Sequence, residues 1–67
     1  MQGTWKKVPE LLNGIPVGEY DALFDADGRL IATARHDGAL AIADITAAAG
    51  HESFLTVEQA KAWVENR

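Results

Sequence analysis

The chain has 67 residues, a net charge of -4 and no cysteine, and these properties exclude several classes of protein. A chain of this length is expected to form one domain, residues 1–67, which buries only about 60% of the surface that its unfolded form exposes. Without cysteine there is no disulfide framework, zinc–thiolate site or thiolate nucleophile, and a cytoplasmic location is favoured. Ten acidic against six basic side chains argue against nucleic-acid binding, and no apolar run approaches the roughly 20 residues of a membrane span.

Residues 1–18 are expected to form an irregular N-terminal segment. Pro9 and Gly14 suit a single helical turn, with proline at its first position and glycine just past its end. Asn13 and Gly14 also suit a tight turn, and the helical turn is preferred. Pro16 prevents a continuing helix, so the segment leads as an extended connector into the sheet or adds a fourth strand to it.

The middle of the chain is expected to form a three-stranded antiparallel meander. Apolar and polar residues alternate with a period of two in three stretches, 19–25, 29–35 and 39–45. The turns between them end at Gly28 and Gly38, each preceded by an aspartate. Both turns are predicted to have three residues and a glycine bulge at positive φ.

These turns fix a register that brings matching side chains together. On the side predicted to face the C-terminal helix, the pairs are Phe24 with Leu30, Ala22 with Ala32, Tyr20 with Ala34, Ala34 with Leu40, and Ala32 with Ile42. On the other side, opposite charges meet at Asp25 with Arg29 and at Glu19 with Arg35. The same register places Leu23, Ile31 and Ala43 as an apolar strip facing away from the helix. This strip needs a cover, either residues 1–18 of the same chain or a second copy of the chain. We favour the second copy, which makes the protein a homodimer.

The tail, residues 56–66, has the clearest signal in the chain, that of a capped amphipathic helix. Thr56 and Gln59 form a predicted capping box, so the helix should begin at Val57. The helix has an apolar stripe that must be buried against another part of the chain. The stripe consists of Val57, Ala60 and Val64, with Trp63 on its flank. Phe54 is expected to pack in the core and so to hold the residues that lead into the helix against the sheet. Residues 46–52 are interpreted as a crossover loop, with a short helix capped by Asp44 and ended by Gly50 as the alternative.

Together these elements predict an α+β fold: a three-stranded meander, with a fourth strand as an option, and a C-terminal helix packed on one face. The residues proposed to bind a partner are the acidic strand edge, Glu19, Asp21, Asp25 and Asp27, and two members of the apolar strip, Leu23 and Ile31. No cofactor and no catalytic residue are predicted. The alternative is a subunit of an oligomeric enzyme, or a metal-dependent protein that uses His36 and His51.

The end of the chain also suggests a resemblance. Residues 53–63, with Phe54, the capped turn, the Glu58-Gln59 pair and Trp63, are similar to the ends of many small uncharacterised bacterial and phage-encoded proteins, some anti-CRISPR proteins among them. The resemblance implies a small accessory protein. The leading hypothesis is therefore a noncatalytic protein-binding module that inhibits or tethers a host protein.

Overall fold

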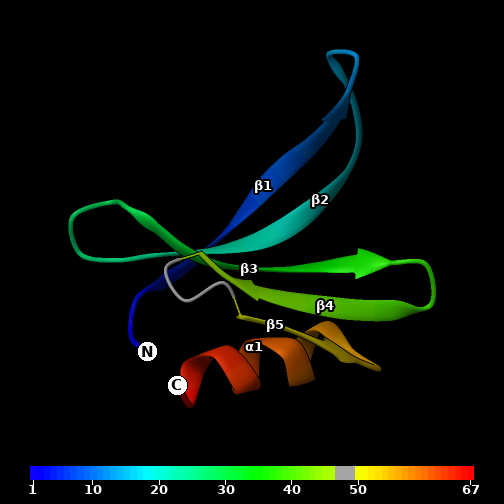
Figure 1. Ribbon diagram of the computed structural model, residues 1–67. Coiled ribbons are helices and arrows are strands. Elements are labelled where there is room, and N and C mark those ends of the chain that lie inside the picture. The colour runs from blue at the N-terminus through cyan, green and yellow to red at the C-terminus, as the bar shows by residue number, and fades with distance from the viewer. Residues whose placement is uncertain (47–49) are drawn as a thin grey trace.

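The computed structural model describes residues 1–46 and 50–67, which form a five-stranded antiparallel sheet and one helix. The elements are β1 (Thr4–Leu12), β2 (Ile15–Phe24), β3 (Leu30–Asp37), β4 (Leu40–Ile45), β5 (Gly50–Phe54) and α1 (Val57–Glu65). Each strand pairs with the one before it, and α1 packs against β3, β4 and β5 (Figure 1). The predicted α+β meander with a C-terminal helix is confirmed, but the sheet has five strands rather than three or four.

The two additional strands lie on either side of the predicted meander. At the start, residues 4–18, expected to be irregular, form β1 and the first part of β2. At the end, β5 occupies residues assigned to a crossover loop. The alternative short helix was centred on residues 47–49, which lie outside the described residues.

The first hairpin turns at Asn13 and Gly14, not through a helical turn at Pro9. Leu12 pairs with Ile15, and the two loop residues have φ values of 52° and 81°. A two-residue type I′ turn needs positive φ at both positions, and asparagine followed by glycine provides this with least strain. The tight-turn alternative is therefore confirmed and the preferred helical turn is wrong.

The second turn has the three-residue loop that the sequence predicts. The Asp25 amide donates to the Arg29 carbonyl at 2.9 Å, and the Gly28 amide donates to the Asp25 carbonyl at 3.0 Å. Asp25 Oδ1 also accepts hydrogen bonds from the amides of Asp27 and Arg29, both at 2.9 Å. Gly28 has the expected positive φ, at 80°, and Phe24 pairs with Leu30 as predicted.

Immediately after that pair, a β-bulge shifts the register of β2 against β3. Leu23 pairs with Ala32, which leaves Ile31 as the extra residue. A slip of one residue turns a strand's side chains to the opposite face. The later predicted pairs are therefore wrong: Ala22 lies opposite Thr33 rather than Ala32, and Ala34 lies opposite Asp21 rather than Tyr20.

The third turn is shorter than predicted. Asp37 pairs with Leu40, so the loop is Gly38 and Ala39, and Gly38 has a φ of 63°. Glycine at the first loop position is typical of a type II′ turn, whose twist matches that of the flanking strands. The positive φ of Gly38 is confirmed, but the three-residue loop is wrong. Its predicted pairs are replaced by Ala34 with Ala43 and Ala32 with Ile45.

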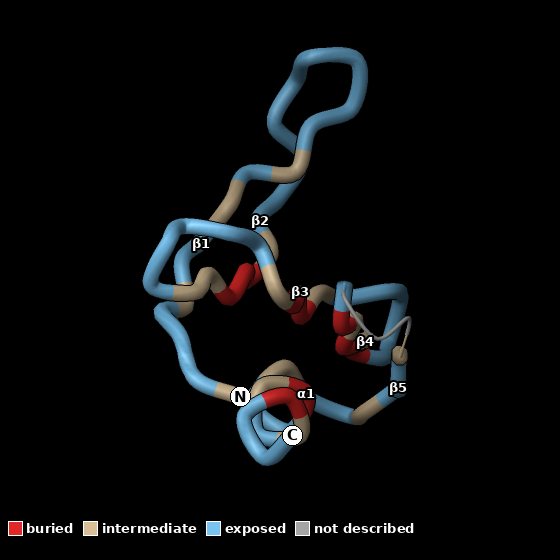
Figure 2. The backbone as a smooth tube through the Cα atoms, turned by 60° about the vertical axis from the view of Figure 1, so that its left-hand side comes forward, coloured by how far each residue is buried: buried red, intermediate tan, exposed pale blue. Residues whose placement is uncertain are grey.

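The core lies between α1 and the face of the sheet that α1 covers, called here the inner face (Figure 2). Its buried residues are Leu23, Ala32, Ala34, Ala41, Ala43 and Ile45 from the sheet, with Ala60 and Val64 from the helix. The sequence assigned Ala32 and Ala34 to this face correctly. Because the register differs, Tyr20, Phe24 and Ile42 lie on the opposite face, called here the outer face.

The helix begins at Val57, as the capping box predicts. The Gln59 amide donates to Thr56 Oγ1 at 3.1 Å, and the Thr56 amide donates to Gln59 Oε1 at 3.3 Å. Ala60 and Val64 are buried, while the Trp63 ring packs on the Phe54 ring with centroids 5.9 Å apart. In the part of the chain that the structure describes, no helix has the length and apolar character needed to cross a membrane.

Candidate functional site

The end of the β1–β2 hairpin extends beyond the rest of the sheet. Pairing between β1 and β2 continues to Leu12 and Ile15, whereas pairing between β2 and β3 begins at Asp21. Residues 11–18, called here the arm, therefore lie away from β3 and α1 (Figure 1). None of these eight residues is charged.

The arm exposes four large aliphatic side chains. Leu11, Leu12, Ile15 and Val17 are 58%, 63%, 64% and 58% exposed. Complete burial of such a side chain is worth about 1.5–3 kcal/mol at about 25 cal/mol per Å², which corresponds to roughly 60–120 Å² each. At these exposures the four present roughly 150–300 Å² of apolar surface. Isolated exposed apolar residues are common, but four of them on one short projecting hairpin mark the arm as the candidate contact surface.

The outer face of the sheet also carries large apolar side chains, among charged ones such as Lys6, Arg35 and Asp44. Its large apolar side chains are Tyr20, Phe24, Leu30, Leu40 and Ile42. Leu30 and Leu40 are each 42% exposed. A sheet with one face in water usually alternates apolar residues inside with polar residues outside. Large apolar groups on the side opposite α1 therefore extend the candidate contact surface from the arm onto the sheet.

Two cations cover the aromatic rings of the outer face. The Lys6 ammonium lies 5.6 Å from the centre of the Phe24 ring, and the Arg35 guanidinium lies 4.4 Å from that of Tyr20. Arg35 extends over Tyr20 to Glu10 on β1, where Nη1 donates to a carboxylate oxygen at 3.3 Å. This side chain links β3 to the base of the arm from the outer side.

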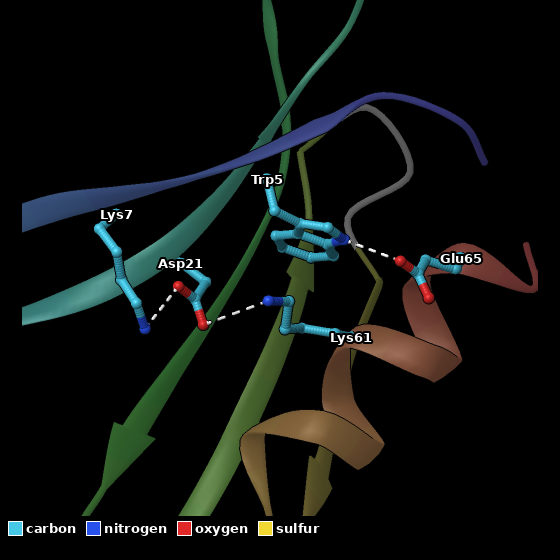
Figure 3. Close-up of polar contacts among 5 residues, drawn as sticks. All are labelled: Trp5, Lys7, Asp21, Lys61 and Glu65. Atoms are coloured by element: carbon cyan, nitrogen blue, oxygen red, sulfur yellow. Dashed lines mark hydrogen bonds and ion pairs between the residues drawn. The ribbon is translucent and has the colours of Figure 1, made fainter.

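A second set of contacts fixes the base of the arm from the inner side (Figure 3). The Asp21 carboxylate, on a residue 5% exposed, lies 2.9 Å from Lys7 Nζ and 3.7 Å from Lys61 Nζ. The hydrogen bond and negative charge of Asp21 raise the pKa of Lys7 above its usual value. Nearby, Trp5 Nε1 donates to the Glu65 carboxylate at 2.9 Å. The arm thus projects from a base held on both faces.

A groove of about 400 Å³ lies between the base of the arm, β3 and the start of α1. This volume falls within the range of about 300–1,000 Å³ typical of ligand sites. Charges of both signs line it, among them Asp21, Lys61, His36 and Glu58. Asp21 already pairs with two lysines, so its carboxylate stabilises the fold and is occupied as a ligand-binding group.

The predicted acidic edge does not form a single surface. Asp21 is buried in ion pairs on the inner face, and Asp25 is half-buried and holds the second turn. Glu19 and Asp27 are exposed, but they lie at opposite ends of the segment of β2 that pairs with β3. The register places Asp21 on the inner face opposite Ala34, while Asp25 and Asp27 belong to the turn that follows β2.

The predicted apolar strip is also absent from the outer face. Leu23 and Ala43 are almost fully buried in the core cluster that includes Ala60 and Val64 of α1, and Ile31 is the half-buried bulge residue, which packs against that core. Leu23 and Ile31 are therefore core residues in this chain. The homodimer predicted to cover the strip loses that reason, although the outer face carries a different set of exposed apolar side chains.

The two histidines do not come together. His36 lies two residues after buried Ala34 on β3, on the same inner face and beside the groove. His51 pairs with Asp44, which faces outward between the buried Ala43 and Ile45. Opposite faces of the sheet separate the two imidazoles, so they cannot ligate one ion within a single chain. Among residues 1–46 and 50–67, no group of three or more His, Cys, Asp or Glu could hold a metal ion.

Comparisons of the chain with protein-family models, curated proteins and solved structures found no match. The residues behind the resemblance of the tail have structural roles: the capping box starts α1, and Phe54 packs on Trp63. Function is therefore inferred from the surface. Sequence reasoning missed the arm, although residues 11–18 form an uncharged stretch around an Asn-Gly turn.

Proposed function

We propose that this protein is a noncatalytic protein-binding module whose main contact is the arm. The observation that carries the proposal is the exposure of Leu11, Leu12, Ile15 and Val17 on an element that projects beyond the sheet. Large aliphatic side chains that are more than half exposed lose contact with water when a partner covers them, which favours association. A small accessory protein that tethers or inhibits another protein would use such an element.

The same geometry supports apolar rather than electrostatic recognition. The acidic residues expected to contact a partner are divided between ion pairs, a turn and two separate exposed positions. The arm itself carries no charge. Salt screens contacts between exposed charges but has little effect on the burial of apolar surface. Binding through the arm should therefore persist between about 50 and about 500 mM salt.

The experiment compares immobilised wild type with two variants in extract of the source cell. Ile15→Glu places a carboxylate at the exposed end of the arm. Leu55→Glu is the matched control, because Leu55 is 74% exposed and lies outside residues 11–18, two residues before the start of α1. Both sites face solvent, so both variants should keep the melting temperature of the wild type.

A protein retained by wild type and Leu55→Glu, lost by Ile15→Glu and retained at high salt would support the proposal. Equal retention by all three chains would contradict it. Loss of retention in high salt would instead support recognition through charge, with the exposed members of the predicted acidic edge, Glu19 and Asp27, as the first residues to test.

A further inference from the structure

We infer that the arm of one copy packs on the outer face of a second copy, and that the reverse contact forms at the same time, giving a two-fold symmetric dimer. The inference rests on the proposed function, since it names the partner of the arm. It uses two apolar surfaces of the same chain: the arm, and the outer face with Leu30, Leu40 and Ile42.

The two surfaces do not contact each other within one chain. The pairing of β1 with β2 shifts register between Glu10 and Leu11, where the arm begins, and the arm extends away from β3 and β4 (Figure 1). In an isologous dimer, each surface finds its complement on the other chain, and both contacts form through one symmetry operation.

Charge also favours the arm as the point where two copies meet. The chain carries a net charge of -4, so two copies repel each other over most orientations. Residues 11–18 are an exception, because they contain no charged side chain. On the outer face, the cations of Lys6 and Arg35 lie over the rings of Phe24 and Tyr20.

The available area explains why the outer face must take part. The four aliphatic side chains of the arm present roughly 150–300 Å², whereas a standard interface buries about 800 Å² on each partner. Contact between two arm tips would therefore fall well short of a stable dimer. In the proposed two-fold dimer, each copy contributes both its arm and its outer face, including the exposed parts of Leu30 and Leu40.

Prolines distinguish side-chain packing from extension of the sheet. Pro9 on β1 and Pro16 on β2 each remove an amide donor from the hairpin. Strand addition depends on main-chain donors along a free edge, and proline is one of the residues that block it. The contact is accordingly made by aliphatic side chains and not by a continuous ladder between copies.

The test is the mass of the protein in solution, measured by sedimentation over a wide range of concentration. Wild type should reach twice the mass of the chain at the upper end of the range. Ile15→Glu in the arm and Leu40→Glu on the outer face should each shift the mass to one chain. Leu55→Glu should keep the dimer, and circular dichroism should show that all three variants are folded.

Three results would overturn the inference: a wild type with the mass of one chain throughout, a dimer that survives Leu40→Glu, or a dimer lost equally in Leu55→Glu. A second measurement uses the absence of cysteine from the natural chain. Mixed Ile15→Cys and Leu40→Cys proteins should form a heterodimeric disulfide under mild oxidation, whereas Leu55→Cys mixed with Leu40→Cys should not. If Ile15→Cys and Leu40→Cys do not form this disulfide, the proposed dimer would also be overturned.

The proposed function can stand when this inference fails. A monomeric wild type that still retains another protein through Ile15 would refute the dimer and support a heterologous partner for the arm. A dimeric wild type whose arm variant loses the dimer but retains the other protein would instead support the dimer and contradict the proposed use of the arm.

Discussion

On β3 and β4 the two faces of the sheet carry apolar side chains of different size, mostly alanine on the inner face and leucine or isoleucine on the outer face. Four alanines, Ala32, Ala34, Ala41 and Ala43, lie on the inner face, where α1 packs closely enough to leave them at most 1% exposed. On the outer face the residues are larger, and Leu30 and Leu40 remain 42% exposed. A close-packed interior fixes side-chain volume, whereas a surface in contact with water or with a partner does not.

We expect the inner face to serve folding and the outer face to serve binding. If the inner face holds the fold together, its substitutions should change stability, and equivalent substitutions on the outer face should change association. Matched pairs of substitutions can test this division, because the same chemical change is available on both sides of the sheet or of the helix.

The largest effect is expected from Leu23→Ala. Leu23 is 1% exposed and is among the largest fully buried side chains, so its truncation removes apolar contacts and leaves a cavity. We expect a loss of about 2–5 kcal/mol in the free energy of unfolding, measured by urea denaturation. Leu40→Ala is the control and should cost less than about 1 kcal/mol. Equal losses from both variants would contradict the distinction between the faces.

A smaller effect is expected from enlarging the helix side of the interface. Ala60 is fully buried against the sheet, while Ala62, two residues later, is exposed. Ala60→Leu should lower the free energy of unfolding by about 1–3 kcal/mol, because a well-packed site cannot accept the extra volume without strain. Ala62→Leu should be nearly neutral. An Ala60→Leu variant as stable as wild type would show that space remains between α1 and the inner face.

The cap of α1 tests whether the helix depends on its own start signal. Thr56→Ala removes the oxygen that accepts from the Gln59 amide, and we expect a loss of about 0.5–2 kcal/mol, seen as a lower melting temperature. Thr4→Ala, at the exposed start of β1, is the matched control. An unchanged melting temperature for Thr56→Ala would mean that packing on the inner face alone holds the first turn.

The smallest effect is expected at Lys7, which contacts Asp21 at the base of the arm. Its pKa is raised in the folded protein, chiefly by the hydrogen bond from its ammonium to Asp21. A raised pKa means that the contribution of Lys7 to stability is fully present below its ordinary value and is lost as the pH rises past the folded value. The stability difference between wild type and Lys7→Met should therefore be constant near neutral pH and decline in strong alkali.

Lys6→Met is the control for that measurement, since Lys6 points to the outer face beside Phe24. Urea denaturation at several pH values gives both differences. A difference for Lys7→Met that grows as the pH rises would contradict the assigned ion pair.

The sequence predicted the features that depend on local chemistry. The capping box of Thr56 and Gln59, the positive φ of Gly28 and Gly38, and the pairing of Phe24 with Leu30 are all confirmed. Each depends on residues close together in the chain, where turn and cap preferences are strong. These elements establish the meander and its helix without information from distant contacts.

The assignment of faces failed because the bulge at Ile31 has no local signal. Both sets of alternating positions in β2 contain large apolar residues, so Leu23 and Phe24 are equally acceptable core residues by pattern alone. The choice between them is made by packing against α1, which favours the alanines of β3 and β4 opposite the helix. The candidate site was missed because residues 1–18 were expected to be irregular, with a helical turn preferred over the tight turn at Asn13 and Gly14.

The consecutive order of the strands also bears on how fast the protein folds and unfolds. Each strand pairs with its neighbour in the chain, so most of the sheet can form through short loops, whose closure has a low entropic cost. The contact from Trp5 to Glu65 joins residues 60 positions apart, and the Met1 ammonium donates to the carbonyls of Glu65 and Arg67. We expect contacts of this kind to form after the main folding barrier, so that they mainly slow unfolding. The folding rate should depend instead on the three turns between β1 and β4.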